Sequence, residues 1–402
     1  METILTVAAS IGTSLVAAFL WDVLARKRGR RSLLNVGRDV VRRVRGRSRA
    51  SVPETLGSGP ESAIPLLVRW LEEDQSDELQ HFGEFGRRAD LKEEKLYITN
   101  KVESIEAKPR LYLTGWPCFV LKRYGLAQNA LARAQEGLEL LLGTEGVIRV
   151  SLGAAPGMAP DARPTLISLR HSVRAAQILL TLDSSNRLGW EIIGKMLDPK
   201  LNWQRPDGGW SQCEGWKSSD LWASAYAIRL LHMLETMADS PYQVSVAVCQ
   251  ERIARTADYL ETQWRAAKQW TYGQASSARN APQIAHEVFP VLRIYTPGLS
   301  NAVHDWLLSW LTPAGTLSAR YIESCNKVTP ASANSRIAYA LFVAGDPALV
   351  WVPLFEHAVN GFEQGVNSAD AAFLLHMAIA LKNGPDSEPR DILIGNRFNP
   401  TR

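Results

Sequence analysis

The sequence predicts an all-α fold in which six two-helix hairpins close into a ring, an (α/α)6 toroid, preceded by an N-terminal transmembrane helix. Three observations lead to this fold class. Beyond residue 62, amphipathic segments alternate six times with apolar segments rich in Ala, Ser and Leu. Alternating β-branched runs bounded by turns, which would indicate strands, are almost absent from this part of the chain. A long run without charged residues precedes the repeat.

That uncharged run is TILTVAASIGTSLVAAFLW, residues 3–21. It is just long enough to cross the hydrocarbon core of a bilayer, which takes about 20 residues. Only Glu2 carries charge ahead of it, so the basic start of a cleaved signal peptide is missing. The cluster RKRGRR follows, and the positive-inside rule keeps it in the cytoplasm. We therefore expect a single-pass anchor over residues 1–25 in the inner (cytoplasmic) membrane, with the body on the cytoplasmic side; this anchor is also a route to oligomerisation.

The basic residues are concentrated next to the predicted anchor. Of 45 Lys and Arg and 41 Asp and Glu, the first 50 residues hold 11 and 3, which leaves 34 and 38 for the rest. Residues 26–62 are expected to form a basic juxtamembrane segment, which contacts anionic lipid through residues 26–49 and ends in a linker rich in Ser, Pro and Gly. No aromatic residue interleaves the arginines of residues 37–49, which argues against nucleic acid as a partner.

The ring is expected over residues 63–385, with a C-terminal tail at residues 386–402. The amphipathic helices recur at roughly 50–60 residues, whereas tetratricopeptide and HEAT-type repeats are about 34 and 40–47 residues long. The apolar helices should form the inner barrel and the amphipathic helices should wrap around it. An open solenoid would need polar terminal caps, and the sequence offers no clear ones.

One turn within the repeat carries a specific motif. QRPDGGW, residues 204–210, has the form Gln-x-x-Asp-Gly-x-Trp. It resembles the QW repeat of the terpene cyclase and protein prenyltransferase superfamily, whose members fold as α/α toroids. The resemblance implies a structural role, in which Gln204 satisfies backbone groups at a helix end and Trp210 stacks on a neighbouring turn. Asp207, before two glycines, favours the turn itself.

The candidate site residues lie where inner helices are expected to begin. Ser218-Ser219-Asp220 predicts a helix N-cap. In a toroid the inner helices all start at the same end, so their N-termini surround one mouth of the cavity and favour an anion or a carbonyl there. We predict a ligand site at this mouth, built from His171, Trp216, Lys217, Asp220, Trp222, His286, Arg336 and Asp370. The same rim is expected to include Arg170, Glu287, Asn334 and Asn367. Taken singly, each of these residues has an ordinary role as a cap or as a solvated side chain.

The chemistry implied by the resemblance is not carried by the matching residues. Terpene cyclases that protonate their substrate use a D-x-D-D motif, in which neighbouring carboxylates tune the proton donor. The segment here is KSSDLW, with Asp220 as its sole acid. Protein prenyltransferases hold zinc through an Asp-x-Cys pair, and Trp222 stands where the cysteine would be. We therefore expect no metal and no cofactor, and the candidate catalytic residues are Asp220, His286 and Glu287.

Two functions remain open at this point. The leading one is a membrane-anchored, cytoplasm-facing toroid that binds a lipid, peptide or protein ligand at its mouth, without zinc or D-x-D-D catalysis, as a bacterial signalling or defence effector would. The alternative is an enzyme of the terpene cyclase or prenyltransferase type that acts on an isoprenoid or another lipid-derived substrate. Glycan processing would need two carboxylates facing across a sugar bond, which a sequence cannot measure. The four cysteines form no CxxC pair, so neither a structural zinc site nor a disulfide framework is predicted.

Overall fold

The computed structural model describes the part of the chain that follows the basic segment. The described residues are 60–77, 82–86, 95–98, 101–104, 110–151, 165–236, 245–267, 270, 277–324, 328–362, 365–384 and 392. They belong to one unit, Ser58–Arg402. The predicted anchor, the basic segment and most of the predicted tail lie outside them. Among the residues described, no helix has the length and apolar character needed to cross a membrane.

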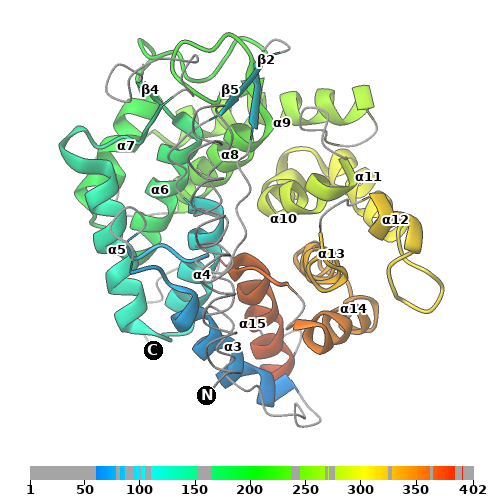
Figure 1. Cartoon of the computed structure of the whole chain (residues 1–402). Coiled ribbons are helices and arrows are strands. Elements are labelled where there is room, and N and C mark those ends of the chain that lie inside the picture. The colour runs from blue at the N-terminus through cyan, green and yellow to red at the C-terminus, as the bar shows by residue number, and fades with distance from the viewer. Residues whose placement is uncertain are drawn as a thin grey trace, which may run out of the picture. The chain divides into compact units, whose positions relative to one another are not determined.

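Six helices form the inner layer of this unit. They are α4 (Leu111–Arg123), α6 (Leu169–Leu182), α8 (Leu221–Thr236), α10 (Ser277–Tyr295), α13 (Pro330–Ala344) and α15 (Ser368–Asn383). Each packs against the next in that order, and α15 packs against α4, so the cycle closes as the sequence predicts (Figure 1).

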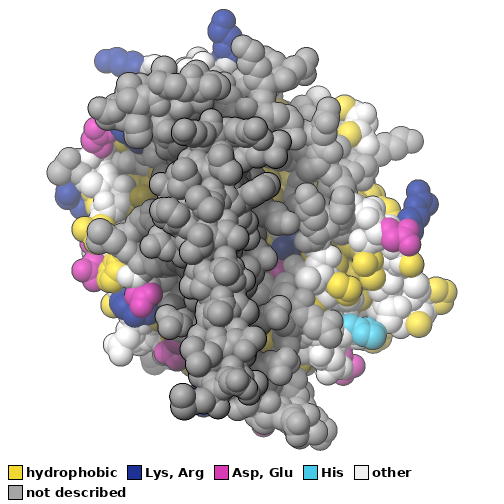
Figure 2. All heavy atoms as spheres, in the orientation of Figure 1, with side chains coloured by type: hydrophobic (Ala, Val, Ile, Leu, Met, Phe, Trp, Pro, Cys, Tyr) yellow, Lys and Arg dark blue, Asp and Glu magenta, His cyan; other side chains and the backbone are white. Residues whose placement is uncertain are grey.

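The amphipathic helices lie outside this cycle (Figure 1). They are α3 (Pro60–Asp74), α5 (Gln128–Leu142), α7 (Arg187–Leu197), α9 (Val246–Ala267), α11 (Pro297–Leu308) and α14 (Ala348–Asn360). Among the described residues, two shorter helices accompany them, the 3-10 helix η2 (Gly143–Glu145) and α12 (Ala319–Ser324). Outer helices α7, α9 and α14 pack on the inner helices that precede them, and α3 packs on α15. Figure 2 shows hydrophobic side chains on the visible surface over α12 to α14.

Local sequence explains where several of these helices begin. Ser168 caps α6 by accepting a hydrogen bond from the His171 N–H, and Thr329 caps α13 in the same way. Asn367 and Asp370 form a reciprocal capping box at the start of α15. These caps satisfy backbone N–H groups that the first helical turn leaves without partners. They therefore fix the level at which the inner helices start.

Three short antiparallel strand pairs were not predicted. They are β1 (Lys95–Ile98) with β2 (Lys101–Ser104), β3 (Arg149–Ser151) with β4 (Thr165–Ile167), and β5 (Trp210–Ser211) with β6 (Ser219–Asp220). The strands are two to four residues long, too short for a period-two hydrophobic pattern to be visible in the sequence. The last pair sets Trp210 opposite Asp220, immediately before α8.

The predicted hollow needs a correction, because side chains fill the ring at its midsection. Trp116 of α4 and His286 of α10 belong to helices on opposite sides of the cycle. Their ring centroids are nevertheless only 4.9 Å apart. Phe373 of α15 lies 4.8 Å from His286, and all three side chains are buried. At this level the axis is therefore occupied by aromatic rings.

Candidate functional site

The Gln204–Trp210 turn is structural, as the resemblance implies. The Gln204 side-chain amide donates to the Gly208 carbonyl at 3.1 Å and to the Arg252 carbonyl of α9 at 3.0 Å. The Trp210 indole N–H donates to the Thr256 hydroxyl at 2.9 Å. The helix carbonyl that Gln204 reaches lies in the second turn of α9, so the expectation of a helix end is corrected. The turn fastens the α7–α8 connection to α9.

Asp220 acts as the N-cap of α8. Its Oδ1 accepts a 2.7 Å hydrogen bond from the Ala223 N–H, and its carbonyl accepts one from the Ser224 hydroxyl. Burial is the main cause that raises the pKa of Cys213 and of Tyr259 in α9, and the Asp220 charge raises both pKa values further. Asp220 is thus engaged on the side of α8 that faces the outer layer. This arrangement suits a structural cap better than a proton donor on the axis.

The other predicted rim residues make contacts of their own. The Arg170 guanidinium lies over the Trp222 ring at 5.7 Å. Asp370 accepts hydrogen bonds from Arg336 Nε at 3.0 Å and from the Ser332 hydroxyl at 2.5 Å. Of the further side chains of the predicted set, Lys217 is exposed, Trp216 is half-buried, and the half-buried His171 bonds to the Ser168 hydroxyl.

Two contacts bring the starts of three inner helices, α4, α8 and α15, to one end of the ring. The Ser368 hydroxyl at the start of α15 donates to the Leu113 carbonyl in the first turn of α4. Tyr112 of α4 lies edge-on to Trp222 of α8, with 5.7 Å between the ring centroids. Tyr112 was not predicted as a site residue, although it stands at the equivalent position of its own helix. The starts of α4, α8 and α15 therefore lie together, and Tyr112, which the sequence did not single out, is among the residues there.

A buried ion pair lies deeper in the ring. Arg174 of α6 contacts Glu287 of α10 through Nη2–Oε1 at 2.9 Å and Nη1–Oε2 at 3.2 Å, and neither side chain is exposed. Arg174 also donates to the Gln177 side chain, which in turn donates to the Tyr226 carbonyl of α8. A Cβ on Gly115 would lie 2.7 Å from Arg174 Nε, so this glycine makes room for the guanidinium. The pair links three inner helices.

Aromatic rings surround the Arg174 guanidinium. Its Cζ lies 4.7 Å from the centroid of Tyr226, 4.8 Å from that of Phe119 and 5.3 Å from that of Trp116. Aromatic faces attract cations, and the attraction is stronger where water is excluded. The walls of the ring at this level therefore form an environment that favours positive charge.

The ionisable groups around this pair have shifted pKa values. Burial raises the pKa of Glu287, while the positive charges of Arg174 and Arg229 act against this rise. Burial, and then the charges of Arg174, Arg336 and Arg229, hold the pKa of His286 well below its usual value. Burial lowers the pKa of Arg229 to about 10. Burial thus favours the neutral form of the His286 imidazole, and the Glu287 carboxyl lies against the Arg174 guanidinium.

Several buried polar atoms along the axis make no hydrogen bond. Both ring nitrogens of His286, the Tyr112 hydroxyl and the Asn334 side-chain oxygen have no partner in the described structure. An unsatisfied buried polar group costs about 1–3 kcal/mol. These atoms run from the mouth toward the midsection, so polar groups capable of binding a molecule continue inward from the rim.

Sequence reasoning missed the two arginines of this cluster. Arg174 and Arg229 each interrupt an apolar helix predicted to be buried all round. A charged residue inside such a helix is rarely left without a partner, and this was the available signal. His286 and Glu287 were predicted, but they lie inside the ring and not on its rim. Within the described residues no three His, Cys, Asp or Glu side chains are grouped to hold a metal ion, and Cys118, Cys213 and Cys249 are free and buried.

No protein-family model matches the chain, and no curated protein matches it in sequence. Among solved structures it is similar to the type II terpene cyclase MstE from Scytonema, with a TM-score of 0.48 and 12% identity over 80% of this chain and 98% of that one. A MstE variant solved with geranylgeranyl dihydroxybenzoate, its substrate, gives 0.43 and 14% over 77% and 80%.

The chain is also similar to ent-copalyl diphosphate synthase from Streptomyces platensis, with a TM-score of 0.46 and 15% identity over 67% of this chain. It spans about half of that enzyme, since the match covers 50% of it. These proteins are terpene cyclases, the group that the Gln204–Trp210 motif resembles. The evidence for the closed ring is the packing of this chain's own inner helices.

Proposed function

We propose that the ring is an enzyme that acts on an isoprenoid or another lipid-derived substrate, admitted at the end where the inner helices begin. This is the alternative function derived from the sequence, with its residues revised. The observation that carries it is the buried group of Arg174, Glu287, Arg229 and His286 at the axis, enclosed by aromatic rings. Ionisable groups with strongly shifted pKa values gather at functional sites more often than in ordinary cores.

The cluster supports proton abstraction better than proton donation. Burial favours the neutral form of His286, and the Arg174 guanidinium, 2.9 Å from Glu287 Oε1, opposes the rise that burial causes in the pKa of Glu287. Both can accept a proton, and the surrounding aromatic faces favour a cationic species that is about to lose one. Asp220, the acid of the original alternative, is engaged as a helix cap. We therefore assign His286 and Glu287 to the reaction and leave Asp220 out of it.

The mouth supplies polar groups that a substrate would meet first. Trp222, Asn334 and Arg336 are 6%, 7% and 7% exposed, and we assign them to the inner edge of the rim because each lies near the start of its helix. Trp222 offers an apolar face, while Arg336 offers a charge that Asp370 already balances. This combination suits a ligand with a long apolar part and one polar end.

The test uses the full chain and two matched histidine variants. His286→Phe keeps an aromatic ring in the cluster but removes its nitrogens. His376→Phe makes the same change at a second buried histidine, whose Nδ1 lies 3.2 Å from the Tyr339 hydroxyl. The proteins are incubated with a C20 isoprenoid diphosphate and with an uncharged C30 polyene, and products are identified by gas chromatography and mass spectrometry. We expect His286→Phe to lose about 10²-fold or more of the turnover, as removal of a general base does, and His376→Phe to keep it.

A second candidate is the binding module that the sequence placed first, in which the ring holds a lipid, peptide or protein without converting it. The capping role of Asp220 favours it, because the segment that matches the cyclase acid motif has a structural task. Native mass spectrometry of the protein extracted from membranes separates the two. A lipid or partner retained unchanged, with no conversion of either substrate, would favour binding and reject the enzyme.

The membrane anchor at residues 3–21 remains part of the proposal on sequence grounds, together with the inner-membrane location and the lipid contacts of residues 26–49. Carbonate extraction of membranes from cells that express the full chain tests it. The chain should stay in the membrane fraction, and removal of residues 1–25 should release it. A full chain that is released equally would exclude a spanning anchor.

A further inference from the structure

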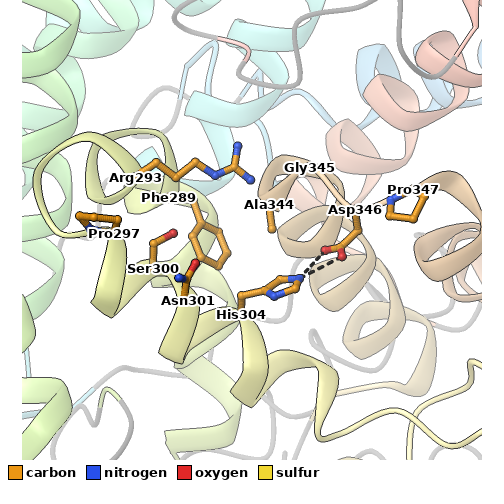
Figure 3. Close-up of a pocket in the computed structure, with 10 residues that line it drawn as sticks. All are labelled: Phe289, Arg293, Pro297, Ser300, Asn301, His304, Ala344, Gly345, Asp346 and Pro347. Atoms are coloured by element: carbon orange, nitrogen blue, oxygen red, sulfur yellow. Dashed lines mark hydrogen bonds and ion pairs between the residues drawn. The ribbon is translucent and has the colours of Figure 1, made fainter.

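A second site is suggested at the opposite end of the inner helices, independently of the proposed reaction. A cleft of about 290 Å³ opens there, between the C-terminal turn of α10, the start of α11 and the α13–α14 turn (Figure 3). Its lining residues are Phe289, Arg293, Pro297, Ser300, Asn301, His304, Ala344, Gly345, Asp346 and Pro347. Because α10 and α13 end here, this cleft is separate from the mouth at which they begin.

Two helix N-termini meet at the cleft, and neither is closed by a side chain. The N-cap residues of α11 and α14 are Thr296 and Pro347, and no side-chain hydrogen bond caps either helix. The first-turn N–H groups of a helix carry partial positive charge and bind anions when they are not otherwise satisfied. Both helices are longer than three turns, so each has a developed dipole.

Ser300 provides an independent sign of a ligand. Its side chain is in the wall of the cleft, and the residue is only 5% exposed. Its hydroxyl makes no hydrogen bond within the described structure, and Figure 3 shows it directed into the space bordered by Arg293 and Phe289. The hydroxyl lies in the cleft wall, where a bound molecule can supply its partner. Ser300 can therefore donate to a molecule held in the cleft.

The charged and titratable groups of the cleft are one arginine, one histidine and one aspartate. His304 Nε2 lies 2.9 Å from both carboxylate oxygens of Asp346, so the acid is already engaged (Figure 3). That contact, more than burial, raises the pKa of His304. Arg293 extends over the α13–α14 turn, and a Cβ on Gly345 would lie 3.0 Å from its Nη2. Gly345 thus lets the guanidinium reach the cleft, where its planar donors suit an oxyanion.

The molecule contains an internal comparison at the α6–α7 turn, which has the same place in its own hairpin. A cleft of about 280 Å³ lies there, lined by residues that include Glu139, Asp183 and Arg187. Asn186 caps α7 by accepting a hydrogen bond from the Gly189 N–H. That cleft therefore combines a closed helix N-terminus with two carboxylates, which disfavours an anion. The α10–α11 cleft instead has two helix N-termini without side-chain caps and a single carboxylate.

We propose that the cleft between α10, α11 and the α13–α14 turn binds an oxyanion, the phosphate group of a small molecule or of a lipid headgroup. Ser300 and Arg293 donate to its oxygens, and the N-termini of α11 and α14 stabilise its charge. The His304–Asp346 pair holds the acid away from the anion. Nothing in this assignment depends on catalysis at the ring axis.

The test measures binding of inorganic phosphate to the full chain by isothermal titration calorimetry at pH 7. Arg293→Gln and Ser300→Ala are compared with Arg187→Gln, the matched arginine of the α6–α7 cleft. We expect Arg293→Gln to weaken phosphate binding about tenfold or more and Ser300→Ala to weaken it severalfold, while Arg187→Gln binds as the unchanged protein does. Equal binding by all four proteins, or no binding at millimolar phosphate, would overturn the proposal. Vesicles of phosphatidylcholine with and without phosphatidic acid then identify the source, since a headgroup site requires Arg293→Gln to reduce the acid-dependent binding more than Arg187→Gln does.

Discussion

Replacement of Glu287 by glutamine is the change that tests the axis of the ring most directly. It leaves the Arg174 guanidinium buried without its carboxylate, while the shape of the partner is kept. Loss of one partner from a buried pair costs about 3–5 kcal/mol. Arg174 would still contact the Gln177 side chain and three aromatic faces, so we expect about 3 kcal/mol, the lower end of that range.

This free energy converts into a measurable melting shift. The unit that contains the ring, Ser58–Arg402, has about 345 residues. At about 2.1 cal/mol/K for each residue, its unfolding entropy is about 0.7 kcal/mol/K, so 3 kcal/mol lowers Tm by about 4 °C. Differential scanning calorimetry of the full chain measures this shift. Glu191→Gln is the control, because it breaks the surface pair with Arg187 and should cost at most about 1 kcal/mol.

The double variant Arg174→Met/Glu287→Leu completes the test. It replaces both charges by apolar side chains of similar size, a change that is often neutral or stabilising for buried pairs. We expect it to melt near the unchanged protein, well above Glu287→Gln. If Glu287→Gln instead shifts Tm no more than Glu191→Gln, the two helices do not meet as described, and the packing of α6 and α10 across the axis is wrong.

Three further changes probe other parts of the ring. Gly208→Ala should cost about 1–3 kcal/mol more in urea denaturation than Gly215→Ala, because both have positive φ but only the Cβ at Gly208 would meet a backbone carbonyl of α9; equal costs would contradict the tight turn. Burial keeps His286 and His376 neutral, the latter with its pKa lowered to about 3, so their contribution is complete above pH 6.5 and is lost as the pH falls, at up to about 1.4 kcal/mol per unit for each. His376→Phe should flatten the dependence of unfolding free energy on pH between 5 and 6.5, and an unchanged slope would show that this histidine is protonated or exposed. Asp220→Asn should change stability by less than about 0.5 kcal/mol and preserve turnover, since asparagine caps helices as well as aspartate does; a loss of turnover in a folded variant would return Asp220 to the catalytic set.

The hairpin order could be predicted because burial on all sides leaves a strong mark on composition. Residues 219–234 and 367–381 are mostly apolar and show no polar face, and both overlap inner helices. Residues 189–197 have one polar and one apolar face, which likewise indicated an outer helix. Ring closure was predicted because the first and last hairpins lack polar caps. Without caps, their apolar faces are buried only if these two hairpins pack against each other.

The side chains that lie on the axis could not be predicted, because a rotation of a helix by a few tens of degrees about its own axis changes which residue points inward. His171 and Arg174 are one turn apart on α6, yet His171 bonds to the capping Ser168 and Arg174 points inward. The partner of Arg174 is 113 residues away in the sequence. A helix of mixed polar and apolar residues has a visible face, whereas one that is buried all round does not show which residue faces the axis.

The buried pair at the axis is difficult to explain by stability alone. The inner helices carry small residues such as Ala175, Ala176 and Ala338, which let neighbouring helices approach closely, so only long side chains reach the centre. Leucine or phenylalanine would fill that space without desolvating two charges, and such replacements tend to stabilise. A ring selected only for stability would therefore have lost Arg174 and Glu287. If the apolar double variant melts as high as the unchanged protein and converts no substrate, the pair is retained for the reaction; if it remains active, the pair only fixes the packing of α6 against α10.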